Sequence, residues 1–261
     1  MCPELFRIGN FVISTYGVFV AVGMIIAFYI FLYFVKKENI DEKKAENIFL
    51  FTIVGGLIGA RIAYIIEHPD QFKTLVDYVA IWKGGIDWFG GFLGGVFTAL
   101  LLIRYYKVNI WKISDAAAVA LIIGHGIGRI GCTFAGCCYG KPIPEHSFWE
   151  HFGITFPEGS AAPPGMKLYP TQPLEAILNI FIFFILFLVY RKKFFDGQIF
   201  SMYLILYGTE RFFLEFLRNV TPPIEPIGLT WNQIVSILMV IFGISLIVYR
   251  LKYQKVLKLN E

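Results

Sequence analysis

Long apolar stretches separated by short polar loops are the dominant pattern along this chain. A helix needs roughly 20 mostly apolar residues to cross a bilayer. Seven stretches meet or approach that length, at roughly 13–35, 46–66, 88–106, 113–134, 171–190, 197–217 and 227–249. The third starts with the glycine-rich run GGFLGG, and the fourth and sixth contain charged residues. The pattern predicts an all-α polytopic membrane protein with seven transmembrane helices.

The composition agrees with this fold class. Hydrophobic residues make up 57% of the 261 positions, and the mean hydropathy is +0.64. A soluble domain of this length would be less apolar. We expect one integral membrane domain over residues 1–261 that crosses the membrane several times. No basic segment with a cleavage site precedes the first apolar stretch, so we expect no removed signal peptide.

The basic residues of the loops predict the orientation. One set of loops and the C-terminal tail carry 14 Lys and Arg, whereas the opposite set, which includes Arg218, carries six. Because cytoplasmic loops are enriched in Lys and Arg, the N-terminus is predicted outside and the C-terminus in the cytoplasm. The net charge of +4 is therefore a topology signal and gives no reason to expect nucleic-acid binding. The turn-rich segment 135–170 is expected to form an external cap.

Three arginines, Arg61, Arg129 and Arg211, fall inside predicted spans. Each lies five or six residues from the outer end of its helix, roughly 8–9 Å deep. Ionisable groups inside a membrane mark a functional site by default, and guanidinium groups suit phosphate. The pattern favours a shallow cationic cavity for an anionic lipid headgroup. Structural ion pairs or side chains that reach to the interface are the alternative.

Acidic and small residues accompany these arginines. Asp87, Glu210 and Glu215 are possible partners, and the pairs Arg211–Glu215 and His125–Arg129 have i,i+4 spacing. Small residues at helical spacing let helices pack closely, and glycine also lets a ligand approach the backbone. The glycines with this spacing are Gly55, Gly56, Gly59, Gly90, Gly91, Gly94, Gly95, Gly124, Gly126, Gly128 and Gly131.

Three of the four cysteines, Cys132, Cys137 and Cys138, lie within seven residues. A zinc site is possible, although the C-x4-C-C spacing lacks the usual C-x2-C element. A disulfide from Cys132 to one of the other two is permitted outside the membrane. Reactive thiol chemistry is a third reading, because a nearby arginine would stabilise a thiolate. Simple packing is a fourth, and the sequence leaves all four open.

Several motifs in order resemble the prolipoprotein diacylglyceryl transferase family over nearly the whole chain. The quoted segments are STYGVFVAVG, GGLIGARIAYII, WKGGIDWFGGFLGG, GRIGCTFAGCCYG, YPTQPLEA and ERFFLEFLR. The fourth is similar to the family signature Gly-Arg-x-Gly-Asn-Phe-x-Asn-x-Glu-x-x-Gly. The resemblance implies a seven-span enzyme that moves the diacylglyceryl group of phosphatidylglycerol to the lipobox cysteine of a prolipoprotein signal peptide, releasing glycerol-1-phosphate.

The resemblance also implies roles for individual residues. Arg129 and Arg211 would hold the phosphate while negative charge develops on the leaving group, and Glu215 would orient Arg211. The residues of this chain that align with the family's motifs and are expected to bind substrate are Tyr16, Arg61, Gly128, Gly131, Cys132, Cys137 and Gly140. We expect no cofactor and no metal.

This chain departs from the family pattern at the groups that would handle protons. The family histidine falls on Phe89, its signature asparagines on Cys132 and Ala135, and its glutamate on Cys137. His125 and Asp87 are the candidate replacement bases. His125 is a candidate because the unperturbed pKa of a histidine side chain is near neutral. His125 could equally be a histidine satisfied between helices.

Other readings remain beside the transferase reaction. A paralogue could keep the phospholipid site and use another acceptor or its own cysteines. A lipid-binding scaffold or transporter, or a membrane thiol oxidoreductase, would also use intramembrane charge, glycine-rich helices or the cysteine pair.

Overall fold

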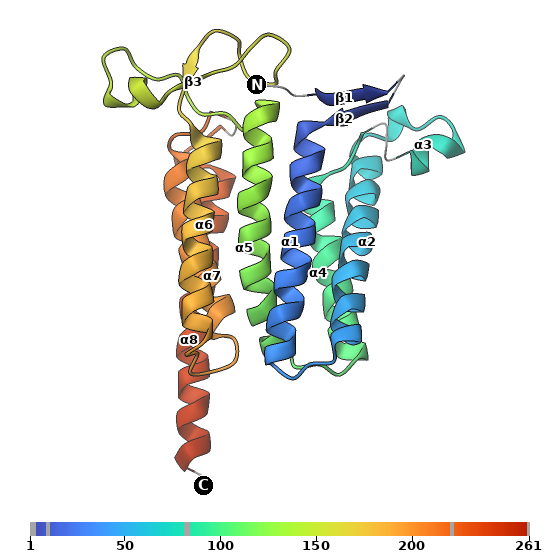
Figure 1. Ribbon diagram of the computed structural model, residues 1–261, viewed down its shortest axis with the longest axis vertical. Helices are drawn as coiled ribbons and strands as arrows, with labels where there is room; N and C mark the ends of the chain where they lie inside the picture. Colours follow the sequence, from blue (N-terminus) through green and yellow to red (C-terminus); the bar gives the residue numbers. More distant parts are fainter. Residues whose placement is uncertain (1–3, 9–10, 81–83, 220–221, 260–261) are drawn as a thin grey trace. The chain divides into compact units, whose positions relative to one another are not determined.

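The computed structural model describes residues 4–8, 11–80, 84–219 and 222–259. Every predicted apolar stretch coincides with a long helix (Figure 1). These helices are α1 (Thr15–Lys37), α2 (Glu42–Glu67), α4 (Trp88–Tyr105), α5 (Ile110–Ala135), α6 (Thr171–Tyr190), α7 (Gln198–Glu215) and α8 (Trp231–Leu259).

Among the described residues, six helices are long and apolar enough to cross a membrane, namely α1, α2, α4, α5, α6 and α8. Helix α7 is not among them, because it carries polar and charged side chains that include Glu210, Arg211 and Glu215. The chain is thus a largely helical protein with six candidate membrane spans. The seventh span, the orientation of the termini and the external position of the cap stay predictions.

Two short antiparallel strand pairs correct the all-α prediction. Strand β1 (Glu4–Ile8) pairs with β2 (Phe11–Ser14), and β3 (Ile154–Thr155) pairs with β4 (Lys167–Leu168). Strand β2 was missed because its residues, FVIS, run directly into the apolar α1 and read as part of the same span. Single helical turns also occur at η1 (Pro69–Gln71), α3 (Leu75–Val79) and η3 (Phe148–Phe152).

The segment between α5 and α6 is a folded element with its own small core. Phe156, Ala162 and Leu168 are buried together, with Tyr139 and Ile154 packed against them. The Lys141 backbone amide donates to the carbonyl of Leu217 over 2.8 Å, which ties this segment to the end of α7.

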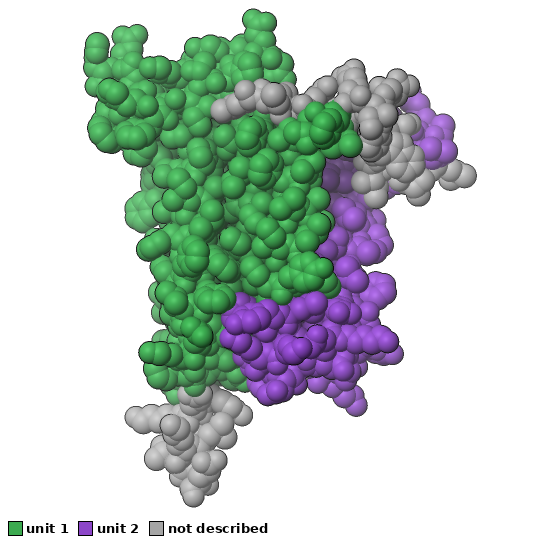
Figure 2. Space-filling view, viewed as in Figure 1, with its two compact units in different colours: residues 1–31, 114–261 green, residues 32–113 purple. Residues whose placement is uncertain are grey.

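The chain divides into two compact units, residues 32–113 and residues 1–31 with 114–261 (Figure 2). In the 32–113 unit, helices α2 and α4 pack through their glycines. A Cβ built on Gly59 would lie 2.4 Å from the carbonyl oxygen of Gly90, and one on Gly94 would lie 2.5 Å from that of Gly55. The predicted close packing of these glycine-rich helices is confirmed.

Close contacts also connect the helices of the other unit. A Cβ on Gly23 of α1 would meet the carbonyl oxygen of Gly124 of α5 at 2.9 Å. Gly126 of α5 faces Asn179 of α6, and Gly208 of α7 faces Ser236 of α8. Helices α6 and α7 are in contact as well. The neighbours therefore run in the order α1, α5, α6, α7, α8.

A fully buried carboxylate on α5 holds the start of α7. Asp115 accepts hydrogen bonds from the backbone amides of Gly197 at 2.9 Å and Phe200 at 3.0 Å, and from Nζ of Lys193 at 3.1 Å. These bonds satisfy amides that the first turn of a helix leaves without partners. Asp115 thereby positions the helix that carries Arg211 and Glu215.

Candidate functional site

Arg129 and Glu175 form a buried ion pair between α5 and α6. Nε of Arg129 lies 3.0 Å from Oε1 of Glu175, and their side chains are only 13% and 2% exposed. Helix α6 begins at Thr171, so Glu175 lies one turn inside a helix that has no other charged residue. A carboxylate at such a place is costly unless a positive charge compensates it.

His125 contacts the same pair from one turn below Arg129. Nε of Arg129 donates to Nε2 of His125 over 3.1 Å, and that nitrogen lies 3.2 Å from Oε1 of Glu175. The ring also packs edge-on against Tyr207 of α7, at 5.3 Å between centroids. The i,i+4 contact predicted for His125 and Arg129 is confirmed, and the alternative of a histidine satisfied between helices is supported.

Arg218 continues the arrangement toward α7. Its Nη1 lies 3.8 Å from Oε2 of Glu175, and its Nε lies 3.9 Å from Oε2 of Glu215. Arg218 was counted among the basic residues of the predicted outer loops, and the structure adds that its side chain is buried, with 6% exposed. It lies just past the end of α7, where the two carboxylates draw it inward.

Glu215 connects Arg218 to Arg211. Its Oε2 lies 2.9 Å from Nη1 of Arg211, so the predicted i,i+4 proximity is confirmed. Its Oε1 accepts hydrogen bonds from Asn232 at 2.8 Å and Thr230 at 3.1 Å, at the start of α8. Glu215 is therefore held from two sides and fixes the position of Arg211.

We call these five side chains the charged cluster: Arg129, Glu175, Arg218, Glu215 and Arg211. Positive and negative groups alternate along it, and three guanidinium groups face two carboxylates. The cluster therefore carries one positive charge in excess. An anion bound beside it would offset that charge in surroundings where a buried charge is costly.

Space exists beside the cluster on α5. A Cβ built on Gly128 would meet no atom within 4 Å, whereas one on Gly131 would lie 2.8 Å from Cβ of Phe19 and 3.3 Å from Cα of Tyr16. Gly128, which precedes Arg129 in the sequence, therefore faces open space. Gly131 instead allows the first turn of α1, including the exposed Tyr16, to pack on α5.

Gly140 has a packing role. A Cβ there would lie 2.5 Å from the carbonyl oxygen of Tyr169, and the residue pairs with Arg218 in an isolated antiparallel bridge. The absence of a side chain at Gly140 lets the first part of the cap pack against the backbone of Arg218.

The cysteines converge at the end of α5. The Sγ atoms of Cys132, Cys137 and Cys138 all lie within 4.8 Å of one another, and none forms a disulfide. We call them the thiol cluster. Hydrogen bonds from the Cys132 and Cys137 thiols lower the pKa of the Cys138 thiol, and the positive charges of Arg129 and Arg218 act in the same direction.

Backbone contacts fix the thiol cluster to α6. Nε2 of Gln172 donates to the carbonyl oxygen of Cys137 over 2.9 Å, and Oγ1 of Thr171 donates to that of Cys138 over 3.1 Å. Nη1 of Arg129 lies 3.9 Å from Sγ of Cys132. The thiol cluster and the charged cluster are therefore neighbours that share Arg129.

Arg61 and Asp87 serve the 32–113 unit. The Arg61 guanidinium donates to carbonyl oxygens of Asp77, Tyr78, Gly84 and Gly85. Oδ1 of Asp87 caps α4 by accepting from the Gly90 amide at 2.7 Å. Both contacts hold loops to helices. A role for Arg61 in substrate binding, or for Asp87 as a base, stays a prediction. Phe89, in place of the family histidine, offers no proton acceptor.

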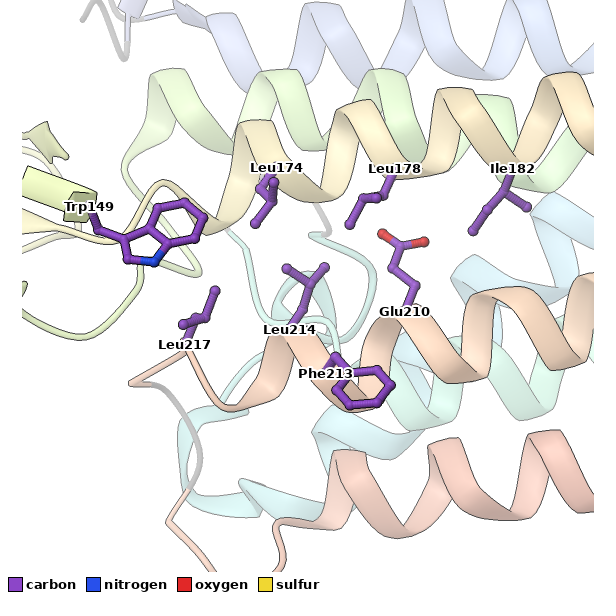
Figure 3. A pocket seen from close by; sticks show the side chains of 8 residues that line it. All are labelled: Trp149, Leu174, Leu178, Ile182, Glu210, Phe213, Leu214 and Leu217. Atoms are coloured by element: carbon purple, nitrogen blue, oxygen red, sulfur yellow. The ribbon is translucent and has the colours of Figure 1, made fainter. Parts of the chain in front are cut away.

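An apolar groove of about 340 Å³ lies between α6 and α7. Its lining residues are Trp149, Leu174, Leu178, Ile182, Glu210, Phe213, Leu214 and Leu217 (Figure 3). Glu210 is the acidic member of the lining. Leu174 and Leu214 directly precede Glu175 and Glu215 in the sequence, so the groove runs beside the charged cluster.

Glu175 is a member of the charged cluster that the sequence pattern did not single out. It stands in the quoted motif YPTQPLEA, and the rule applied to intramembrane arginines applies equally to an intramembrane carboxylate. Arg218 was missed because it falls beyond the predicted span. The contacts of Gln172 and Thr171 with the cysteine backbone had no sequence signal.

Six candidate membrane spans and a buried cluster of arginines and glutamates define a multi-pass membrane protein with a polar site within its helices. A sequence model of the prolipoprotein diacylglyceryl transferase family matches residues 3–249. The chain belongs to that family and is a transferase.

Several bacterial relatives are similar along most of their length. A phosphatidylglycerol–prolipoprotein diacylglyceryl transferase 2 from Clostridium perfringens is 34% identical, with 90% of each chain covered. The Clostridium tetani transferase is 32% identical over 94% of this chain and 96% of its own. The Listeria innocua transferase is 32% identical over 95% and 89%. These similarities favour the transferase reading over a scaffold, a transporter or a thiol oxidoreductase.

Proposed function

We propose that this protein transfers the diacylglyceryl group of phosphatidylglycerol to the lipobox cysteine thiol of a prolipoprotein signal peptide, releasing glycerol-1-phosphate. The names of the relatives support this reaction. The observation that carries it in this chain is the charged cluster, in which Arg129 and Arg211 belong to one buried network with positive charge in excess.

In this proposal Arg129 and Arg211 bind the phosphodiester of the lipid. When the bond between glyceryl carbon and phosphate oxygen breaks, negative charge grows on the departing phosphate. Guanidinium groups already oriented by Glu175 and Glu215 stabilise that charge without reorganisation. Gly128 leaves room for the headgroup beside Arg129, and the apolar groove between α6 and α7 suits an acyl chain.

The remaining candidates have supporting roles here. Tyr16, Gly131 and Gly140 shape the wall of the site through the contacts of α1 and the cap. His125 is a weak general base in this arrangement, since an Nε2 that accepts from Arg129 is not free to take a substrate proton. We therefore assign His125 to positioning Arg129 and Glu175, and the acceptor thiol needs a different activator.

We further propose that α7 is the seventh span and that the cap, at about 135–170, lies outside the bacterial plasma membrane. The N-terminus would then be external and the C-terminus cytoplasmic. The excess of Lys and Arg in alternate loops supports this orientation. The charged cluster would face the outer leaflet, where exported precursors present their lipobox.

Reconstitution tests the reaction. The full chain in nanodiscs should convert labelled phosphatidylglycerol and a lipobox peptide into lipidated peptide and glycerol-1-phosphate. Arg129→Ala and Arg211→Ala should each lower the rate at least about 100-fold, whereas Lys167→Ala, which alters an exposed pair on the cap, should leave it unchanged. Absence of product from intact wild-type protein, beside an active relative as positive control, would refute the reaction. Normal rates in either arginine variant would refute the phosphate role.

A further inference from the structure

The thiol cluster has the dimensions of a metal site. Zinc lies about 2.3 Å from thiolate sulfur, so neighbouring sulfurs in a tetrahedral site are about 3.8 Å apart. The three Sγ atoms lie within 4.8 Å of one another. Side-chain rotations that move the sulfurs by less than about 1 Å would bring all three to bonding distance. The linear spacing C-x4-C-C hid this convergence, and it is why the sequence analysis expected no metal.

The backbone is shaped to bring these thiols together. Gly136 ends α5 with a φ of +71°, and Cys138 has a φ of +60°. The left-handed conformation is uncommon for a residue other than glycine, and such residues gather at functional sites. Hydrogen bonds from Gln172 and Thr171 hold the carbonyls of Cys137 and Cys138 in this turn.

The charges agree with a bound cation and thiolate ligands. A zinc ion with three thiolates carries one net negative charge. The adjacent charged cluster carries one net positive charge, and Arg129 belongs to it while lying 3.9 Å from Sγ of Cys132. Arg129 therefore places a positive charge next to the proposed thiolate ligands.

We propose that Cys132, Cys137 and Cys138 bind one zinc ion and leave its fourth position for the acceptor cysteine of the substrate. This inference rests on the proposed transferase function. Among the described residues, the metal-ligand group at this place consists of these three thiols. Structural zinc sites have four protein ligands, whereas three ligands and an open position are typical of catalytic zinc.

The zinc ion supplies the activation that the site otherwise lacks. The acceptor thiol replaces a water on zinc and binds as thiolate, and its proton passes to solvent. Its sulfur attacks the glyceryl carbon, a carbon–sulfur bond forms, and the carbon–oxygen bond to phosphate breaks. The electron pair leaves with the oxygen of glycerol phosphate, beside Arg129 and Arg211. Zinc keeps its oxidation state, so the step needs no oxidant or reductant.

Metal content is the first test. Full-length protein purified in nanodiscs with reductant should contain about one zinc per chain by mass spectrometry of the metal. Cys132→Ser, Cys137→Ser and Cys138→Ser should each reduce zinc content at least about tenfold. Cys2→Ser is the control and should retain the metal. Equal zinc content in wild type and the three variants would overturn the site, and so would a disulfide within the thiol cluster of the purified protein.

The open position is tested by X-ray absorption at the zinc edge, which does not depend on turnover. We expect three sulfur neighbours at about 2.3 Å and one lighter atom. Adding a lipobox peptide should change this to four sulfurs, whereas the same peptide with serine in place of cysteine should leave three. Four sulfurs or none before peptide, or no change on adding the cysteine peptide, would overturn the proposal.

Activity separates this inference from the proposed function. Chelator-treated wild type should lose at least about 100-fold in rate and regain it with added zinc, with its thermal unfolding monitored to show that it stays folded. Full activity without zinc would overturn the zinc role and leave the transferase function standing. Zinc-loaded protein that binds the peptide through a fourth sulfur but gives no lipidated product would instead refute the transferase reaction.

Discussion

At the residue scale, Glu175 is the group that joins the site. Its two oxygens face Arg129 at 3.0 Å and Arg218 at 3.8 Å, so one carboxylate aligns cations from two separate segments. Removing one partner of a buried charge pair leaves the other uncompensated, which costs more than the pair contributes. A neutral residue at position 175 therefore changes both the stability of the fold and the orientation of Arg129.

We predict that Glu175→Gln lowers the transfer rate roughly 100-fold and the free energy of unfolding by about 3 kcal/mol. Gln keeps the shape and a hydrogen-bonding oxygen but loses the charge. Product formation and thermal unfolding in nanodiscs are the measurements. Glu150→Gln is the matched control, because Glu150 pairs with Lys167 on the exposed cap at 3.4 Å. Equal rates in both variants would contradict the role of Glu175.

Gly128 offers a prediction about space. A Cβ at this position meets no atom within 4 Å, so Gly128→Val should fold normally while filling the room beside Arg129. We expect the transfer rate to fall at least tenfold and the unfolding temperature to stay unchanged. A small change in the shape of a pocket weakens transition-state binding by about 1–3 kcal/mol. Gly126→Val is the contrasting variant and should destabilise, because a Cβ there meets Asn179 at 3.2 Å. A normal transfer rate in Gly128→Val would mean that the lipid headgroup binds elsewhere.

At the element scale, the helix positions followed from apolar length alone, because a bilayer requires helices of a set length. The ends were less predictable. Strand β2 was not predicted, because its last two residues were counted in the first apolar stretch, and nothing indicated that Arg218 turns inward just after α7. Hydropathy describes an average over a segment, and it does not report which polar side chains find buried partners.

The packing of α2 on α4 gives an element-scale prediction. Gly59→Leu should force the two backbones apart, since even a Cβ would lie 2.4 Å from the Gly90 carbonyl oxygen. Overpacking of a tight contact costs about 1–3 kcal/mol or more. A lower unfolding temperature and aggregation on size-exclusion chromatography are expected. Gly91→Ala is the control, with its Cβ 3.4 Å from that of Ala60. Normal stability in Gly59→Leu would mean that the helices do not depend on this contact.

At the scale of the whole molecule, burial of Arg218 does not change the charge argument for orientation, because Arg218 still lies in the segment after α7. Six basic residues stand on the predicted outer side against 14 on the predicted inner side. The asymmetry still favours an external N-terminus and a cytoplasmic C-terminus.

Reporter fusions check that orientation. Alkaline phosphatase inserted after Glu158 in the cap should be active, because this enzyme folds only outside the cytoplasm. The same reporter joined after Glu261 should be inactive, while a fluorescent protein joined there should be bright. A pattern with both reporters reversed would refute the predicted orientation. An active phosphatase at both places would refute three spans, α6, α7 and α8, between the cap and the C-terminus.

The sequence by itself determined the membrane class, the helix positions, the glycine contacts and the identity of most cluster members. These features depend on length, composition and local spacing, which a linear pattern records directly. Only the tertiary structure decided that Glu175 and Arg218 connect Arg129 to Arg211, that Arg61 is engaged by loop carbonyls, and that three spaced cysteines meet. Those facts depend on which faces of α5, α6 and α7 are turned toward one another. Helix packing sets that rotation, and no single segment encodes it.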